Sequence, residues 1–157
     1  MASNSNPINK LWIGLACAFL VLMAYLWSTY YMASQRDPIY RTVLSSAVAF
    51  PSPKTAPTTT IVFLRIEKAD PSPEFLASIQ EARFIVRPGS RGSSTGNAMH
   101  SDEYRDNETG EIGIGLNLGP IEWKGRNSAE VNAGGFVYVV KKEDRGWVLD
   151  YTGFYMN

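Results

Sequence analysis

The side chains that could carry out acid–base chemistry gather in one polar stretch of the chain. The only histidine stands in the run His100, Ser101, Asp102 and Glu103. Residues adjacent in sequence cannot all point the same way, whereas a catalytic triad needs side chains that converge in space. We therefore expect His100 to be a polar loop residue. We predict no catalytic residue in the chain, and the sequence leans against an enzyme.

The same stretch is acidic, which raises the question of a bound cation. Its candidate ligands are Asp102, Glu103, Asp106 and Glu108. Several such oxygens can hold Ca²⁺, but the spacing departs from that of an EF-hand because Gly110 is misplaced relative to Asp106. We predict a solvated acidic loop in which these residues are only weak metal candidates, and we predict no cofactor.

Residues 89–96 (GSRGSSTG) have the glycine content of a phosphate-binding loop. They lack the Lys-Ser/Thr pair of a P-loop, and no helical pattern obviously follows them. The simplest interpretation is a turn within a longer polar loop over residues 89–111, which shows no hydrophobic periodicity. A loop of more than about 15 residues is either functional or mobile.

The composition of the 157-residue chain argues against nucleic-acid binding. Lysine plus arginine balance aspartate plus glutamate at 15 each, and from Thr58 onward 11 basic residues face 14 acidic ones, a net charge of −3. No basic stripe is present to neutralise phosphates. The single cysteine, Cys17, rules out an intrachain disulfide and a multi-cysteine metal site.

The strongest signal in the sequence is an uncharged run over residues 11–35. As a helix with about 1.5 Å rise per residue, residues 11–33 span roughly 34 Å, slightly more than a hydrocarbon core of about 30 Å. The aromatic residues near its two ends, as expected at the headgroup level, are Trp12, Trp27, Tyr30 and Tyr31. We predict a transmembrane helix over residues 11–33 after an N-terminal tail over residues 1–10, with the lipid bilayer as its first partner.

Two other interpretations of this segment stay open. A cleavable signal peptide would end after Ala33, but Tyr31 occupies a position that should be small. A lipoprotein would be lipidated at Cys17, but Gly14 stands where leucine is normally wanted, and the apolar stretch before Cys17 is short. A retained single span fits best.

The orientation of the span involves two conflicting indications. The flanking charges are Lys10 with the N-terminal amine on one side, and Arg36, Arg41 and Lys54 on the other. This count favours a C-terminal domain inside the cell. A short tail, a signal-anchor and one soluble domain are, however, the usual plan of proteins exported across an inner membrane. We expect the domain to lie on the periplasmic or extracellular side.

Residues 34–57 are predicted to form an amphipathic helix and a linker. Asp37-Pro38 is typical of a helix start, because aspartate can cap free N–H groups and proline fits the first helical position. Apolar residues then recur at helical spacing, so we predict a helix over residues 38–49. The proline-rich segment 51–57 (PSPKTAP) is predicted to be an extended linker.

Residues 58–157 suit one small α+β domain. β-Branched residues predict a strand over 58–68, and Ser72-Pro73 predicts the start of a helix of about ten residues. Further strands are predicted over residues 84–87, 111–123, 129–142 and 147–156, with Gly134-Gly135 as a bulge and 143–146 as a hairpin turn. We expect a curved antiparallel sheet of about four to five strands with one or two helices.

The order of these motifs resembles that of a known class of domains. The motifs are a helix with Phe75-Leu76, a strand ending near residues 86–90, GLNLGPIEW (115–123), a glycine-rich bulge at 133–135, and FVYVV (136–140) leading to Gly-Trp-Val. Together they resemble small exported or membrane-anchored bacterial domains of unknown function with a cystatin-like or NTF2-like shape. The resemblance implies export and a curved sheet, and it carries over no catalytic residues.

Aromatic residues concentrate in the C-terminal strands and form the candidate partner or ligand surface: Trp123, Phe136, Tyr138, Trp147, Tyr151 and Tyr155. We expect half of the aromatic residues there to fill the core and the others to line the concave face of the sheet. The predicted function is that of a single-span membrane-anchored protein whose domain is a protein-interaction or envelope-assembly module. The alternatives are an NTF2-like domain that binds or hydrolyses a small molecule in the concavity, and a spacer whose span makes the functional contacts.

Overall fold

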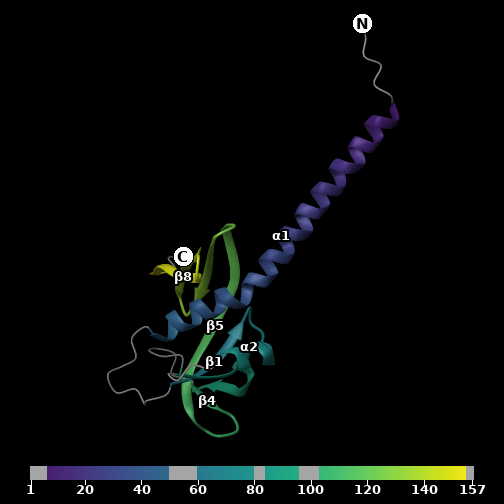
Figure 1. Cartoon of the computed structure of the whole chain (residues 1–157). Coiled ribbons are helices and arrows are strands. Elements are labelled where there is room, and N and C mark those ends of the chain that lie inside the picture. The colour runs from purple at the N-terminus through teal and green to yellow at the C-terminus, as the bar shows by residue number, and fades with distance from the viewer. Residues whose placement is uncertain (1–6, 50–59, 80–83, 96–102, 155–157) are drawn as a thin grey trace. The chain divides into compact units, whose positions relative to one another are not determined.

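The computed structural model describes residues 7–49, 60–79, 84–95 and 103–154, and it has an α+β fold (Figure 1). The chain divides into two compact units, Met1–Arg36 and Asp37–Asn157. The elements are α1 (Pro7–Ala49), β1 (Thr60–Ile66), α2 (Pro73–Ser78), β2 (Phe84–Pro88), the 3₁₀ turn η1 (Gly89–Arg91), β3 (Gly92–Ser94), β4 (Glu103–Asp106), β5 (Ile112–Gly125), β6 (Ser128–Ala133), β7 (Phe136–Glu143) and β8 (Gly146–Phe154). The predicted linker over 51–57 lies outside the described residues.

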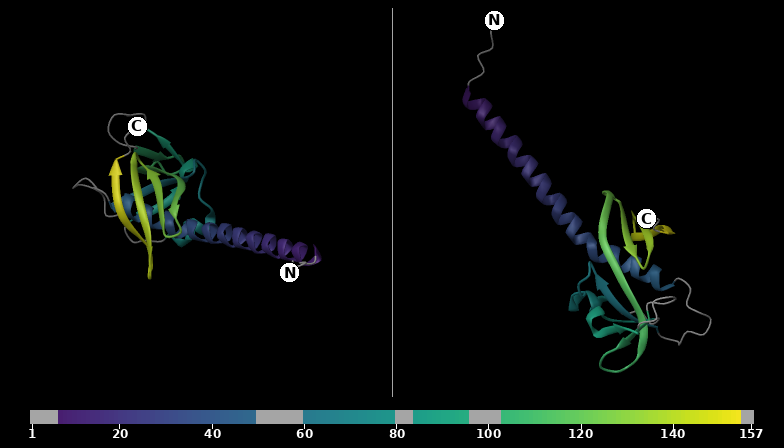
Figure 2. Two further views of the ribbon diagram at one scale, coloured as in Figure 1. Left: turned by 90° about the horizontal axis from the view of Figure 1, so that it is seen from above. Right: turned by 180° about the vertical axis from the view of Figure 1, so that it is seen from behind.

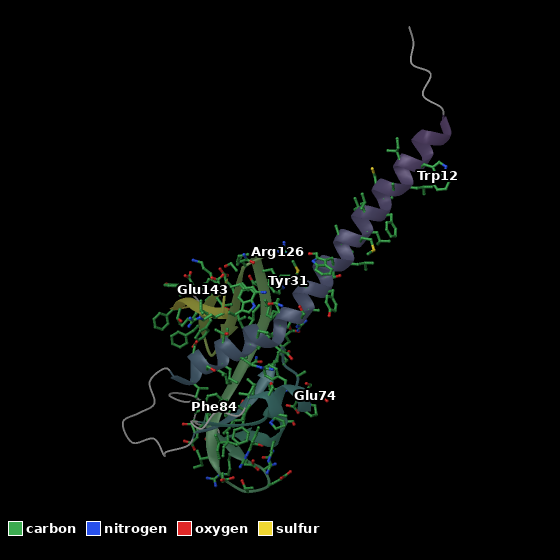
Figure 3. The ribbon with its side chains drawn as sticks, viewed as in Figure 1. Trp12, Tyr31, Glu74, Phe84, Arg126 and Glu143 are labelled. Carbon is green, nitrogen blue, oxygen red and sulfur yellow. The ribbon has the colours of Figure 1, made fainter. Side chains whose placement is uncertain are left out.

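The N-terminal unit contains the apolar part of α1. Side chains from Trp12 to Tyr30 are all exposed, and Figure 3 shows them on every side of the helix between Trp12 and Tyr31. The segment Trp12–Val48 is long and apolar enough to cross a membrane, a test that a signal sequence near an N-terminus also passes. A helix that is apolar all round needs an apolar environment on all sides.

The predicted helix start at Asp37-Pro38 is wrong, because α1 continues through Pro38 and ends only at Ala49. A proline inside a helix costs about 3 kcal/mol, since it lacks an N–H and its ring crowds the preceding turn. The four buried side chains that follow it are Ile39, Tyr40, Val43 and Leu44. Burial of such side chains contributes about 1.5–3 kcal/mol each, which outweighs the cost of the proline.

Within the described residues the sheet is mixed and has eight strands, so the predicted antiparallel sheet of four to five strands is wrong in both respects. Its main order is β2-β1-β5-β6-β7-β8, and β4 attaches to β5 and carries β3. Strand β1 pairs parallel with both β2 and β5, whereas the other pairs are antiparallel. The parallel β1–β2 pair follows from the strand–helix–strand order, because the helical connection through α2 returns the chain to the end at which β1 began.

Two of the eight strands lie in the segment that was predicted to be one polar loop over residues 89–111. Strands β3 and β4 pair with each other, Gly92 opposite Asp106, and β4 pairs with β5. They are short and polar, so they carry no alternation of apolar and polar residues that would reveal a half-buried strand. Residues 96–102, which include His100 and Asp102, lie outside the described residues.

Gly134-Gly135 is a hairpin turn and not the predicted bulge. The φ angles of both residues are positive, +56° and +83°, as a two-residue type I′ turn requires. Strands β6 and β7 therefore replace the single strand predicted over 129–142. The hairpin turn at 143–146 is confirmed, with β7 ending at Glu143 and β8 beginning at Gly146. Helix α2 has the predicted Ser72 cap, which accepts a hydrogen bond from Phe75 N, but it ends at Ser78.

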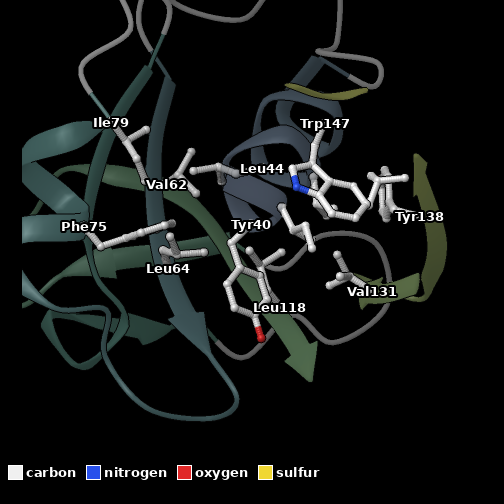
Figure 4. Packing of buried hydrophobic residues seen from close by; sticks show 14 of the residues in the cluster. Tyr40, Leu44, Val62, Leu64, Phe75, Ile79, Leu118, Val131, Tyr138 and Trp147 are labelled. Carbon is white, nitrogen blue, oxygen red and sulfur yellow. The ribbon is translucent and has the colours of Figure 1, made fainter. Parts of the chain in front are cut away.

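The second half of α1 packs against one face of the sheet and forms the core with it (Figures 2 and 4). Tyr40 and Leu44 of α1 lie between Val62 and Leu64 of β1 and the side chains of the C-terminal strands. The Tyr40 hydroxyl donates to Glu67 Oε1 (2.8 Å) and lies 3.2 Å from Gly119 O, so this buried side chain also closes the turn after β1. That turn has positive φ at Glu67 and Lys68.

Candidate functional site

Asp106 is the one buried charged residue in the part of the chain that the structure describes. Its surroundings decide whether the acidic segment could hold a metal. It is 1% exposed. Its carboxylate accepts hydrogen bonds from Arg87 Nη1 (2.5 Å) and Arg91 Nε (2.7 Å), and from the backbone N–H groups of Glu108 (2.8 Å) and Thr109 (3.1 Å). Its negative charge is therefore already matched by donors from the protein.

The electrostatics of Asp106 follow from these contacts. Burial by itself would raise the pKa of its carboxyl, but the two backbone N–H groups and the two arginines favour the charged form more strongly. The net pKa of Asp106 is far below the ordinary value of 3.8. The carboxylate is thus ionised at any physiological pH and works as an acceptor that ties β2 and η1 to the turn after β4.

The neighbouring acidic residues also face arginines. Glu111 Oε2 lies 2.7 Å from Arg87 Nη2, and Glu108 Oε2 lies 2.7 Å from Arg91 Nη2. No group of three or more histidine, cysteine, aspartate or glutamate side chains is arranged to hold a metal within the described residues. Of the four metal candidates, Glu103 lies in β4 and Asp106 and Glu108 belong to this arginine–carboxylate cluster, while Asp102 lies outside the described residues. Sequence reasoning missed the arginines, because they lie on different elements from the acids.

The aromatic residues predicted as a surface divide between core and solvent. Tyr138 and Trp147 are buried, 2% and 8% exposed, and both belong to the core. Trp123 is half-buried and packs edge-on against Trp147, with ring centroids 5.9 Å apart. Tyr155 lies outside the described residues. The remaining two, Phe136 and Tyr151, lie on β7 and β8.

The exposed aromatic side chains of β8 lie on both faces of the sheet. Phe154, opposite Phe136, is 78% exposed, and their ring centroids are 4.8 Å apart at the rim of the core. Tyr151, opposite Val139, is 61% exposed. Its ring lies over Gly153, where an added Cβ would approach it to 2.7 Å. Phe154 belongs to the same aromatic C-terminal strands but was not included in the predicted partner or ligand surface.

Strand β8 is an edge strand: within the described residues it pairs only with β7. A register shift places Asp150 as an extra residue between Leu149 and Tyr151, and Lys141 Nζ neutralises it at 2.8 Å. After this bulge, the segment from Tyr151 to Phe154 carries no charge and no proline. The usual devices that protect a free sheet edge, inward charges and prolines, are therefore missing from its last residues.

One face of the sheet is covered by side chains of α1. Ile39, Tyr40, Val43 and Leu44 lie in one cluster with the inward residues of β1 and β5–β8. The NTF2-like small-molecule alternative stays a prediction.

A small pocket of about 120 Å³ lies elsewhere, between β1, β5, η1 and β4. Its lining residues are Phe63, Arg65, Gly89, Tyr104, Gly115, Leu116, Asn117 and Gly134. Phe63 is paired with Gly115 and Arg65 with Asn117 across the parallel β1–β5 ladder. Because side chains alternate along a strand, Phe63 and Arg65 point to the face opposite Val62 and Leu64 of the core.

Comparison of the chain with protein-family models, with curated proteins and with solved structures found no match. The likeness to cystatin-like and NTF2-like domains therefore stays a prediction, and the function has to be inferred from the geometry of the chain itself.

Proposed function

We propose that the chain is a single-span membrane-anchored protein whose C-terminal domain binds another protein of the membrane or envelope. The exposed apolar helix supports the anchor, and the export plan of the chain favours a domain on the periplasmic or extracellular side. The arginine–carboxylate cluster and the covered sheet face favour a binding module over an enzyme.

One observation carries the binding part of this proposal: the free edge of β8 with Tyr151 and Phe154 exposed beside it. An extended segment of a partner chain can add to such an edge through backbone hydrogen bonds, with side-chain contacts providing specificity. Each backbone hydrogen bond contributes about 0.5–1.5 kcal/mol net, and exposed aromatic residues are typical energetic centres of interfaces. The proposed partner is therefore a protein that presents an extended, uncharged segment with apolar side chains.

Site-specific photo-crosslinking in intact cells tests this proposal. The photoreactive residue p-benzoylphenylalanine replaces Tyr151 or Phe154 in the full chain, and Glu143, an exposed residue at the end of β7, provides the matched control position. We expect an adduct with one other protein at positions 151 and 154 and none at 143. We further expect the double variant Tyr151→Ser/Phe154→Ser to lose co-purification of that protein at unchanged expression.

Three results would contradict the proposal. Adducts absent at both β8 positions would show that nothing lies against this edge. The same adducts at position 143 would show unspecific proximity in the membrane. An adduct that contains only a second copy of the chain would replace the heterologous partner with self-association.

A further inference from the structure

We propose that the pocket between β1, β5, η1 and β4 binds a small organic carboxylate, with Arg65 and Asn117 as the polar recognition groups and the Phe63–Tyr104 ring pair as the apolar wall. This pocket is distinct from the β8 edge, so the inference stands apart from the proposed protein partner.

The first argument concerns charge. Arg65 is the charged residue among the described lining of the pocket, and it is exposed at its mouth. Within the described residues no hydrogen bond or ion pair holds its guanidinium, in contrast to Arg87 and Arg91, which are both bound to carboxylates. A planar guanidinium matches the planar carboxylate with two parallel N–H···O bonds.

Asp70 is the acidic residue on which the charge of Arg65 acts, but its carboxylate forms no hydrogen bond with the guanidinium. One Asp70 carboxylate oxygen accepts a hydrogen bond from Ser90 N at 2.8 Å, and the other accepts from the Ser90 hydroxyl. Its interaction with Arg65 is electrostatic only. The donors of Arg65 are therefore available to a ligand, and the single cation suits a monoanion.

The second argument concerns shape. The rings of Phe63 and Tyr104 are stacked, with centroids 6.0 Å apart and planes at 28°. A Cβ on Gly115 would overlap the Tyr104 ring, and a Cβ on Gly89 would overlap the Arg65 side chain. Glycine at these two positions thus permits the close approach of one apolar and one cationic wall.

Size and polarity together define the ligand class. A volume of about 120 Å³ holds only a few heavy atoms, so the part of the ligand inside the pocket is smaller than a nucleotide or a sugar phosphate. A phosphate dianion would also bring two negative charges to a pocket whose described lining carries one positive charge, on Arg65. A carboxylate with a short apolar tail, either a free acid or the end of a peptide, places its charge on Arg65 and its tail on the rings.

The test follows backbone amide signals of Gly115 and Asn117 by NMR in the full chain, held in detergent micelles, during titration with propionate. Propionamide, which has the same shape and no charge, is the matched ligand control. We expect propionate to cause shifts that saturate with a dissociation constant below about 50 mM, a range typical of very small ligands. We expect propionamide to cause none. A tripeptide with a free C-terminus, compared with its C-terminal amide, shows whether a peptide end also binds.

Variants make the test specific to the pocket. Arg65→Gln should weaken propionate binding at least tenfold, and Arg65→Lys should weaken it less because a point charge remains, whereas Arg145→Gln, at an exposed turn arginine, should have no effect. Unchanged backbone amide signals of the core residues show that Arg65→Gln is folded. No saturable shift with propionate, equal shifts with propionamide, or equal binding by Arg65→Gln would each overturn the inference.

Discussion

Asp106 carries a negative charge into the interior of the domain, where four donors hold it. Removing one member of such a buried arrangement leaves the others unpaired, which is costlier than losing an exposed ion pair. Glu108 offers the comparison, since its side chain is 70% exposed and contacts Arg91 only from the rim of the same cluster.

Asp106→Ala should therefore lower the midpoint of thermal unfolding by roughly 10 °C or more, whereas Glu108→Gln should change it by no more than about 2 °C. Near-ultraviolet circular dichroism of the full chain in detergent measures both midpoints, because this signal reports side-chain packing in the domain. Equal, small effects of the two substitutions would show that Asp106 does not organise the β2–β4 region.

The same cluster predicts how stability depends on pH. The pKa of Glu111 is lowered from the ordinary value of 4.5, first by the Thr109 hydroxyl and then by Arg87, and the pKa of Asp106 is lowered from 3.8. Carboxyls with depressed pKa values stabilise the fold fully above their ordinary pKa values and lose this contribution as the pH falls through the native ones. We expect constant stability above about pH 5 and a progressive loss below about pH 4.

Urea unfolding of the full chain in detergent, repeated from neutral pH down to about pH 2.5, measures this dependence. Asp106→Asn is the matched variant, because it keeps the shape of the side chain and removes the titrating group. It should flatten the acidic limb of the curve. A variant curve parallel to that of the unchanged protein would assign the acid sensitivity to other carboxyls.

At the scale of elements, the turn between β6 and β7 depends on backbone geometry. Gly135 has φ of +83°, and Gly134 has φ of +56°. The φ of Gly134 falls in the left-handed helical region, which asparagine also adopts. Gly135→Ala should destabilise the domain by about 1–2 kcal/mol, whereas Gly134→Asn should be nearly neutral. Chemical unfolding followed by near-ultraviolet circular dichroism compares the two, and equal costs would contradict the assignment of a type I′ turn.

Tyr40 links α1 to the strained turn after β1, and this link predicts a further cost. Tyr40→Phe removes the hydroxyl that donates to Glu67 and leaves the ring in place. We expect a loss of about 0.5–1.5 kcal/mol in unfolding free energy, together with faster amide hydrogen exchange at Glu67 and Lys68. Tyr151→Phe is the control, since the Tyr151 side chain is 61% exposed. Unchanged exchange in Tyr40→Phe would show that the turn holds its positive φ angles without the hydroxyl.

The elements that sequence reasoning predicted well are those with a strong local signal. The Ser72 cap, the β1 strand and the hairpin turn before Gly146 each depend on a few neighbouring residues. The helix start predicted at Pro38 was wrong because proline locally favours the first turn of a helix. Packing of Ile39 and Leu44 against residues distant in the sequence keeps the helix continuous. Strands β3 and β4 were missed because their pairing partners, and not their own pattern, make them strands.

Sites are harder to predict than elements for the same reason. The acidic residues 103–108 were visible in the sequence, but the arginines that neutralise them come from β2 and η1, and only the fold brings them together. The pocket beside Arg65 likewise needs Gly89 and Gly115, whose role appears only when the side chains of other elements approach them. Composition could suggest an aromatic surface, but the strand register decides that Tyr138 is inside and Tyr151 outside.

At the scale of the whole molecule, the proposed anchor raises the question of the side of the membrane on which the domain would lie. The basic residues after the span, Arg36 and Arg41, resist transfer across the membrane, since basic residues favour the cytoplasmic side. The domain itself carries only a small negative charge, and long segments translocate largely regardless of charge. These charges alone do not decide the orientation, and export of the domain behind a retained span stays our prediction.

Two reporter fusions after Asn157 test this orientation. Alkaline phosphatase is active only outside the cytoplasm. Green fluorescent protein is fluorescent in the cytoplasm but stays dark when it is exported through the general secretory pathway. We expect an active phosphatase fusion and a dark fluorescent one. An N-terminal epitope tag that stays on the membrane-bound chain shows that the span is retained, and its loss would indicate cleavage as a signal peptide. Fluorescence with inactive phosphatase would place the domain inside, would make the basic flank the better guide, and would direct the search for the β8 partner to cytoplasmic proteins.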